Sequence, residues 1–236
     1  MRFFSFIARP LSYLLSGIYS VVHNYGLTLF LFTIIVRLCL FPLYASQIKG
    51  QIKMSRIQPQ MKAIQKKYAH DKQELNMQLQ KLYKQEGYNP MKGCLPMLLQ
   101  FPILIGLFYL LRNPTIFLNT DEMILAVHEG LFWISDLSQP DPWILPIMAG
   151  ITTFFSFQIT QMQSQMDPSQ QNQMAGMMKM MKYFFPVMIM WMGHTFPAGL
   201  AMYWFVGNLF TIVQYQVLRK WRKRLEKMID EGKGSI

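Results

Sequence analysis

Long apolar segments recur along the chain, and polar or charged stretches separate them. Apolar stretches with few charges are typical of transmembrane helices. We expect such helices at residues 23–45, 93–112, 143–163, 181–195 and 197–218. The pattern therefore predicts an all-α, polytopic membrane protein with five transmembrane helices.

Two further segments have the periodicity of amphipathic helices. In residues 1–22, apolar side chains recur at helical spacing between arginines and serines, which predicts a helix lying in the membrane interface. A signal peptide is the competing interpretation, but Arg9-Pro10 interrupts the apolar region that such a peptide needs. Residues 46–92 show two helical periods around a turn at Asp71, which predicts a helical hairpin. Pro59 is expected to kink or restart the first helix of that hairpin.

The charged residues are unevenly distributed. The chain has 23 Lys and Arg against 12 Asp and Glu, a formal net charge of +11. Basic residues crowd into 46–92 and 219–236, whereas 113–142 contains acidic residues but no Lys or Arg. By the positive-inside rule, both basic segments and the loop 164–180 face the cytoplasm, and 113–142 and 1–22 lie outside. The N-terminus is therefore expected outside and the C-terminus in the cytoplasm. The hairpin lysines are either a solvated face or a docking surface for lipid headgroups or a partner protein.

Arg37 stands inside the first predicted span. At a rise of about 1.5 Å per residue it lies roughly 15 Å along the helix from Leu27, near the middle of a hydrocarbon core about 30 Å thick. A charged guanidinium there costs about 2.5–3.5 kcal/mol by insertion scales, and it cannot lose its proton. Either the side chain reaches the cytoplasmic interface near Tyr44, or it faces a water-containing cavity in a helix bundle.

Other polar side chains are also placed within the apolar segments. Thr33 lies one helical turn before Arg37, and Gln100 and Gln158 lie in the second and third spans. In the fifth span a polar stripe recurs at positions i, i+4, i+7 and i+11, with Gln214 beside it; its members are Trp204, Asn208, Thr211 and Tyr215. Polar residues in membranes either join helices or line an aqueous path, and a whole stripe favours the path.

Methionines are concentrated around the fourth span, where they include Met177, Met178 and Met181. Methionine is flexible and polarisable, so the cluster suits a surface that accepts many apolar sequences, but it also serves as a simple gap filler. Both interpretations remain open.

The sequence offers little for catalysis or metal binding. Cys39, Cys94 and the four histidines stand singly, without the spacing of metal ligands. There is no nucleophile motif, no phosphate-binding loop and no pair of carboxylates within the apolar segments. We therefore expect no metal, no cofactor and no bond-making chemistry, so the protein is not expected to be an enzyme.

Several motifs together resemble one protein family. They are GCLPMLLQFPILIGLFYLLRNP at 93–114, FPAGLAMYWFVGNLFTIVQ at 196–214, the intramembrane arginine in IIVRLCLFPL, and IQP at 57–59. These segments are similar to the YidC-type membrane protein insertases, and by length the chain resembles the small bacterial form without a large extracytoplasmic domain. The resemblance covers nearly the whole chain and implies location in the bacterial plasma membrane.

The resemblance implies five spans around a hydrophilic groove that is open to the cytoplasm and to lipid but closed on the outer side. Arg37 matches the groove arginine of that family. The implied groove also includes Thr33, Gln100, Gln158, Tyr203, Trp204, Asn208, Thr211, Gln214 and Tyr215. A cytoplasmic surface that receives the substrate is expected to include Ile57, Met61, Ile64, Leu75, Leu79, Met177, Met178 and Met181.

The implied substrates are nascent membrane proteins, whose polar segments would enter the groove and whose apolar helices would leave into lipid between the third and fifth spans. The basic C-terminal tail is expected to hold the ribosome, and the Sec translocon is a further candidate partner. Two other classes remain as alternatives: a small transporter or channel with a polar intramembrane path, and a passive scaffold that works beside a larger translocon.

Overall fold

The computed structural model describes residues 2–89, 91–118, 120–164 and 171–230, and it is almost entirely helical, which confirms the predicted all-α class. The helices in these ranges are α1 (Arg2–Val22), α2 (Tyr25–Cys39), α3 (Phe41–Lys67), α4 (Lys72–Gln85), α5 (Met91–Arg112), α6 (Pro114–Phe117), α7 (Asp121–Ala126), α8 (Ile144–Ser164), α9 (Gln171–Gly193) and α10 (Ala198–Asp230).

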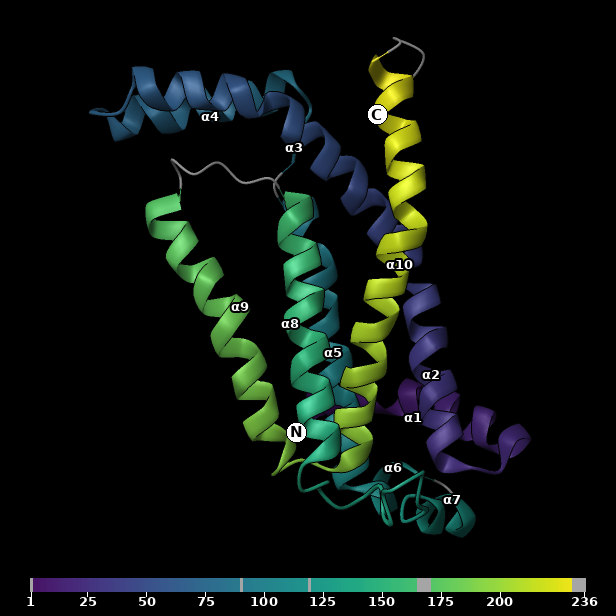
Figure 1. The fold of residues 1–236 in the computed structure, drawn as a ribbon. Helices are drawn as coiled ribbons and strands as arrows, with labels where there is room; N and C mark the ends of the chain where they lie inside the picture. The colour runs from purple at the N-terminus through teal and green to yellow at the C-terminus, as the bar shows by residue number, and fades with distance from the viewer. Residues whose placement is uncertain (1, 90, 119, 165–170, 231–236) are drawn as a thin grey trace.

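Five of these helices, α2, α5, α8, α9 and α10, run alongside one another and form a bundle (Figure 1). Helix α1 lies across one end of the bundle, near α6 and α7, whereas α4 and the far part of α3 project from the other end. Helix α10 packs against both α2 and α8, and α8 also packs against α9. Helix α1 packs against α5 and α2, so the crossing helix joins two members of the bundle.

In the described ranges, none of the helices meets by itself a length and hydropathy criterion for crossing a membrane. The pair α2 and α3 meets the criterion jointly, with a bend of 48° at the break between them. Shorter apolar helical stretches are Phe6–Val22, Gln100–Arg112 and Ile144–Thr160.

The first predicted span, 23–45, is divided between two helices. Helix α2 ends at Cys39 and α3 begins at Phe41, with Leu40 at the break and Pro42 in the first turn of α3. Proline has no backbone N–H, so Pro42 cannot continue the hydrogen bonding of α2, but it is tolerated in the first turn of a new helix, where that N–H needs no helical partner. Helix α3 does not restart at Pro59, which lies within it.

Helices α3 and α4 form a hairpin. The carboxylate of Asp71 begins α4 by accepting hydrogen bonds from the backbone N–H groups of Gln73 and Glu74, both at 3.0 Å. A small apolar core joins the two helices, and its buried members are Ile57, Met61, Leu79 and Leu82. The hairpin therefore has its own core, separate from that of the bundle.

Two predicted boundaries differ from the helices of the structure. Residues 164–180 were expected to be a loop, but α9 begins at Gln171, seven residues before the position of Met178. The expected separate tail at 219–236 begins within α10, which continues to Asp230. Both helices extend because the residues there, mostly Gln, Met, Lys and Arg, have high helix propensity.

The loop between α7 and α8 ties together the ends of α1, α2 and α8 that lie near it. Glu129 accepts hydrogen bonds from the Tyr19 hydroxyl at 2.8 Å and from the backbone N–H of Tyr25 at 2.6 Å, so it joins α1 to the start of α2. Asp141 accepts from the backbone N–H of Leu145 at 2.7 Å and begins α8.

Candidate intramembrane polar site

Arg37 is in the last turn of α2, and its guanidinium lies against α10. Its Nη1 donates to the Tyr44 hydroxyl at 2.9 Å and contacts the Thr211 hydroxyl at 3.5 Å. A Cβ atom at Gly207 would lie 2.5 Å from Nη2 and 3.2 Å from both Nε and Cζ. The guanidinium is thus seated on α10 at a position without a side chain, and it is bonded across the α2–α3 break to Tyr44.

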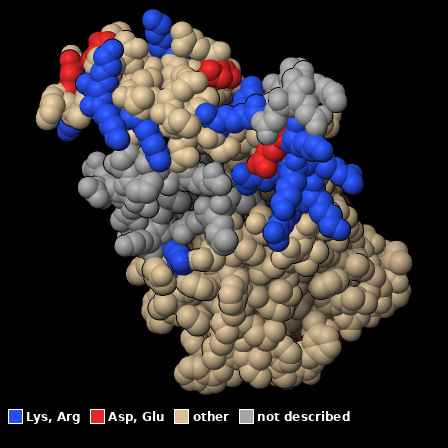
Figure 2. All heavy atoms as spheres, turned by 45° about the horizontal axis from the view of Figure 1, so that its top comes forward, with Lys and Arg blue, Asp and Glu red and all other residues tan. Residues whose placement is uncertain are grey.

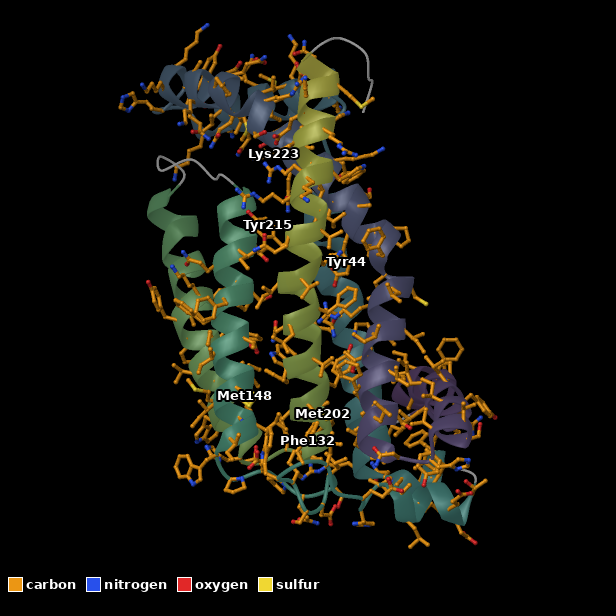
Figure 3. All side chains as sticks on the ribbon, turned by 45° about the vertical axis from the view of Figure 1, so that its right-hand side comes forward. Tyr44, Phe132, Met148, Met202, Tyr215 and Lys223 are labelled. Atoms are coloured by element: carbon orange, nitrogen blue, oxygen red, sulfur yellow. The ribbon has the colours of Figure 1, made fainter. Side chains whose placement is uncertain are left out.

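The hydrogen-bonding capacity of Arg37 is only partly used. Its Nε is buried and has no hydrogen-bond partner in the protein. Among the described residues, Arg37 forms no ion pair, and its named partners are neutral hydroxyl groups. In Figure 3, Tyr44 lies part-way along the bundle, between Met202 at one end and Lys223 at the other. The positive charge is therefore half-buried part-way along the bundle, and within the described part of the chain it has no carboxylate partner.

A second polar cluster joins α8 to α10. The Thr153 hydroxyl accepts hydrogen bonds from Trp204 Nε1 at 2.8 Å and from Asn208 Nδ2 at 2.9 Å, and it donates to the Ala149 carbonyl at 2.6 Å. One donation and two acceptances use the full capacity of a hydroxyl. The indole of Trp204 also contacts Phe185 of α9, with ring centroids 5.8 Å apart. This cluster therefore holds three helices in a fixed arrangement.

A third polar contact joins α5 to α10. Gln100 Nε2 donates to the Tyr203 hydroxyl at 2.9 Å, and the Tyr203 ring contacts Phe32 of α2. The other amide atom, Gln100 Oε1, is buried without a partner, and so is Gln158 Oε1 on α8. An unpaired buried polar atom costs about 1–3 kcal/mol. The described bundle helices hold five such side-chain atoms: Arg37 Nε, Gln100 Oε1, Gln158 Oε1 and the hydroxyls of Tyr25 and Thr28 on α2. They call for a physical reason.

The structure brings most of the predicted groove residues to α10 and its neighbours, but not all of them into contact. Thr33 is fully buried and donates to the Leu29 carbonyl of its own helix, and no bond links it to Arg37. Gln214 is buried and Tyr215 half-buried further along α10. The site thus divides into an Arg37 contact, a Thr153 cluster and a Gln100–Tyr203 pair.

The residues predicted to receive substrate lie in two places. Ile57, Met61 and Leu79 are buried in the hairpin, with Ile64 and Leu75 packed against them. These apolar side chains therefore form the core between α3 and α4, because the apolar stripe of each helix is covered by that of the other helix. Met181 is half-buried on α9, and the side chains of Met177 and Met178 lie outside the described residues.

Three residues of the site were missed from the sequence. Tyr44 is seven residues after Arg37 and was considered only as a marker of the interface. Thr153 lies in the third span five residues before Gln158, and Gly207 directly precedes Asn208. The spacing of Trp204 and Asn208 at i and i+4 was the one available signal that both side chains could reach a common partner.

The comparisons with known proteins bear directly on this arrangement. The family described as 60Kd inner membrane protein matches residues 17–226. The chain belongs to this family. Its description places its members in the inner membrane, in agreement with the predicted plasma-membrane location.

Among curated relatives, the membrane protein insertase YidC of Campylobacter jejuni is 42% identical over 218 residues, covering 92% of this chain and 38% of that protein. Membrane protein insertase YidC 2 of Listeria innocua is 40% identical over 215 residues, covering 89% of this chain and 69% of that protein. The chain thus spans less than half of the first relative. These names confirm the predicted resemblance and agree with a function other than bond-making catalysis.

A solved structure shows the same fold. It is described as an active YidC insertase with the first transmembrane domain resolved, and it aligns with a TM-score of 0.60 at 28% identity. The alignment covers 91% of this chain and 46% of that chain. The helical arrangement of the 60Kd inner membrane protein family is therefore present along nearly the whole chain.

Proposed function

We propose that this protein is a membrane insertase, which takes up polar segments of nascent membrane proteins in a hydrated groove and releases their apolar helices into lipid. In this proposal α2 with the start of α3, α5, α8, α9 and α10 are the five spans. The crossing helix α1 lies in the outer interface, and the α3–α4 hairpin and the end of α10 lie in the cytoplasm. Family membership supports this proposal.

One observation carries the proposal: the half-buried guanidinium of Arg37 lies part-way along the bundle, bonded to hydroxyl groups and paired with no carboxylate of the described residues. In a lipid-filled or tightly packed interior, such a charge would be opposed by a large desolvation penalty. Water in a groove would remove much of that penalty. It would also supply partners for Arg37 Nε, Gln100 Oε1 and Gln158 Oε1.

The same charge would attract an acidic segment of a substrate. At an effective dielectric constant of about 20, a carboxylate about 4 Å from Arg37 gains roughly 4 kcal/mol. That energy would offset part of the cost of bringing a polar segment below the membrane surface. Apolar transfer of the following helix into lipid, with the membrane potential acting on the acidic charge, would then complete insertion without a nucleotide.

We propose a route into lipid other than the one expected from the sequence. The third and fifth spans, α8 and α10, are in close contact and are joined through Thr153, which argues against an exit between them. In the described part of the chain, α9 packs chiefly against α8. Figure 1 shows α9 leaning away from α8 toward the hairpin end. We therefore place the exit beside α9, which packs chiefly against one helix and diverges from it at the hairpin end.

The cytoplasmic end offers contacts for other partners. Figure 2 shows Lys and Arg side chains gathered over the hairpin end and the end of α10, with an uncharged surface below them. Such a basic surface suits anionic lipid headgroups and ribosomal RNA.

Ribosome binding by residues 219–236 predicts weaker co-sedimentation with ribosomes after truncation at Leu218, and unchanged co-sedimentation would exclude this role. A Sec translocon is not needed for the groove mechanism.

The test is insertion of a single-span substrate into liposomes that contain only this purified protein, scored by protection of the substrate from protease. Substrates with an acidic and an uncharged tail are compared for the wild type and Arg37→Ala. We expect protection with the wild type and a loss with Arg37→Ala that is larger for the acidic tail. No protection with the wild type would contradict autonomous insertion and favour a scaffold that requires a partner.

A further inference from the structure

A tight turn in the outer loop carries two aromatic residues at its tip. Leu131 and Ile134 exchange backbone hydrogen bonds, N to O, of 2.8 and 3.0 Å, which leaves Phe132 and Trp133 as a two-residue loop. Phe132 has φ +55°, in the left-handed region. Hairpin loops with positive φ at the first loop position favour glycine there, so a bulky phenylalanine strains the backbone.

The two rings at this tip are open to the surroundings. Phe132 is 89% exposed and Trp133 46% exposed, and the rings stack with centroids 6.1 Å apart and an interplanar angle of 23°. A strained backbone that presents a large apolar side chain outward is typical of a functional contact. The surface formed by Phe132 and Trp133 is named here the aromatic turn.

Two contacts fix the height of the aromatic turn along the bundle. Trp133 Nε1 donates to Asp141 Oδ2 at 3.0 Å, and the same carboxylate oxygen begins α8 at Leu145. On the other side, Leu131 packs on Gly26 at the start of α2, where an added Cβ would lie 2.6 Å from Leu131 Cδ2. The turn therefore lies at the level where both α2 and α8 begin, and Figure 3 shows Phe132 at the end of the bundle away from Lys223.

We propose that the aromatic turn inserts its rings into the headgroup and acyl boundary of the outer leaflet and anchors the outer loop to lipid. The proposal rests on the topology given under the proposed function, in which the first turns of α2 and α8 mark the outer membrane surface. Tryptophan prefers this boundary, because it combines an apolar ring with a polar N–H group. The ring of Phe132 is wholly apolar, so its burial among acyl chains is favoured by the hydrophobic effect. Asp141 satisfies the indole N–H of Trp133 from the protein side, which leaves the ring face for lipid.

The experiment places one environment-sensitive nitrobenzoxadiazole label on the full chain after both natural cysteines are replaced, Cys39→Ser and Cys94→Ser. The labelled site is Phe132→Cys, and the matched control is Glu122→Cys on α7, whose side chain is 68% exposed. Each protein is reconstituted in phosphatidylethanolamine and phosphatidylglycerol vesicles, with or without lipids that carry a nitroxide near the headgroup. Insertion activity is measured on the same vesicles.

We expect a blue-shifted emission and loss of fluorescence by lipid nitroxide at position 132, and a water-like, unquenched emission at position 122. Equal behaviour at the two sites would overturn the proposal. A blue shift at 132 that grows with protein density and resists the nitroxide would also overturn it, because the turn would then contact a second protein copy. Lipid quenching at position 132 without insertion activity would support the lipid contact of the aromatic turn and contradict the proposed insertase function. Insertion activity without lipid quenching would contradict only the lipid contact.

The strain itself has a separate test. Phe132→Gly removes the ring and suits the positive φ, so the melting midpoint of the purified protein in detergent is expected to stay or rise. A lower midpoint would show that the phenylalanine serves the fold rather than a lipid contact, and it would overturn the proposal.

Discussion

Replacing Gly207 by alanine moves the guanidinium of Arg37 without changing any charge. The new Cβ would lie 2.5 Å from Nη2, whereas non-bonded heavy atoms settle at about 3.5 Å, so the guanidinium must shift by roughly 1 Å. It can do so because it is the end of a flexible side chain. The shift weakens the hydrogen bonds to Tyr44 and Thr211, which hold the guanidinium in the bundle.

The two consequences of Gly207→Ala differ in size. In the fold, the better helix propensity of alanine, about 1 kcal/mol, opposes the loss of charged hydrogen bonds worth about 1.5–3 kcal/mol, so we expect a net loss of stability below about 2 kcal/mol. In function, moving a substrate carboxylate from about 4 to about 5 Å at a dielectric constant near 20 removes roughly 0.8 kcal/mol, or about fourfold in insertion rate.

The assay for Gly207→Ala is insertion into proteoliposomes with acidic-tailed and uncharged substrates. The matched control is Gly50→Ala in α3, where an added Cβ meets nothing within 4 Å. We expect the fourfold loss only for the acidic tail and only at position 207. An equal loss for both tails would mean that the fold had changed, and no loss would refute a role for the position of the Arg37 guanidinium.

Two further predictions concern other parts of the structure. Thr153→Val leaves the two donors that bond to this hydroxyl without an acceptor, so the free energy of unfolding should fall by about 1–3 kcal/mol. The measurement is the melting midpoint in detergent, and the control is Thr195→Val at an exposed position. Equal midpoints for the two variants would contradict a stabilising role of the Thr153 cluster. Burial acts to raise the pKa of Asp136, but hydrogen bonds from Ser138 and His128 outweigh it and hold the pKa below its ordinary value of 3.8. The stabilisation that Asp136 gives to this loop is therefore present above the unfolded pKa and lost as the pH falls through the lower folded value. The protection of the loop amides, taken relative to their intrinsic exchange rate at each pH, should therefore fall in acid for the wild type but not for Asp136→Asn.

The sequence was sufficient for the helical class, the family and much of the polar stripe. Arg37 and Thr211 were both named from their positions inside apolar segments, and in the structure Arg37 Nη1 lies 3.5 Å from Thr211 Oγ1. The i, i+4 spacing of Trp204 and Asn208 predicted a shared face, which the common acceptor on α8 now explains. Local periodicity was enough to name these residues, because the position of each along its own helix is a local property.

Features that depend on two helices were not accessible from the sequence. The role of Thr153 follows from the rotation of α8 against α10, and the role of Gly207 follows from how closely α2 approaches α10. The hairpin residue Leu79 was interpreted as open to substrate, because an apolar stripe does not show whether it is covered by a neighbouring helix. The break at Leu40 depends on Pro42. Because this proline lies within a long apolar run, the hydropathy of the run led to the prediction of one continuous span.

The most direct test of the central claim is a charge exchange at position 37. Arg37→Glu is reconstituted alone in liposomes and compared with the wild type for substrates that differ only in an acidic or a basic tail, with protease protection as the readout. If the groove acts through its charge, the wild type should insert the acidic tail better and Arg37→Glu the basic tail better. The same order of preference in both proteins would contradict a charge pair between Arg37 and the substrate.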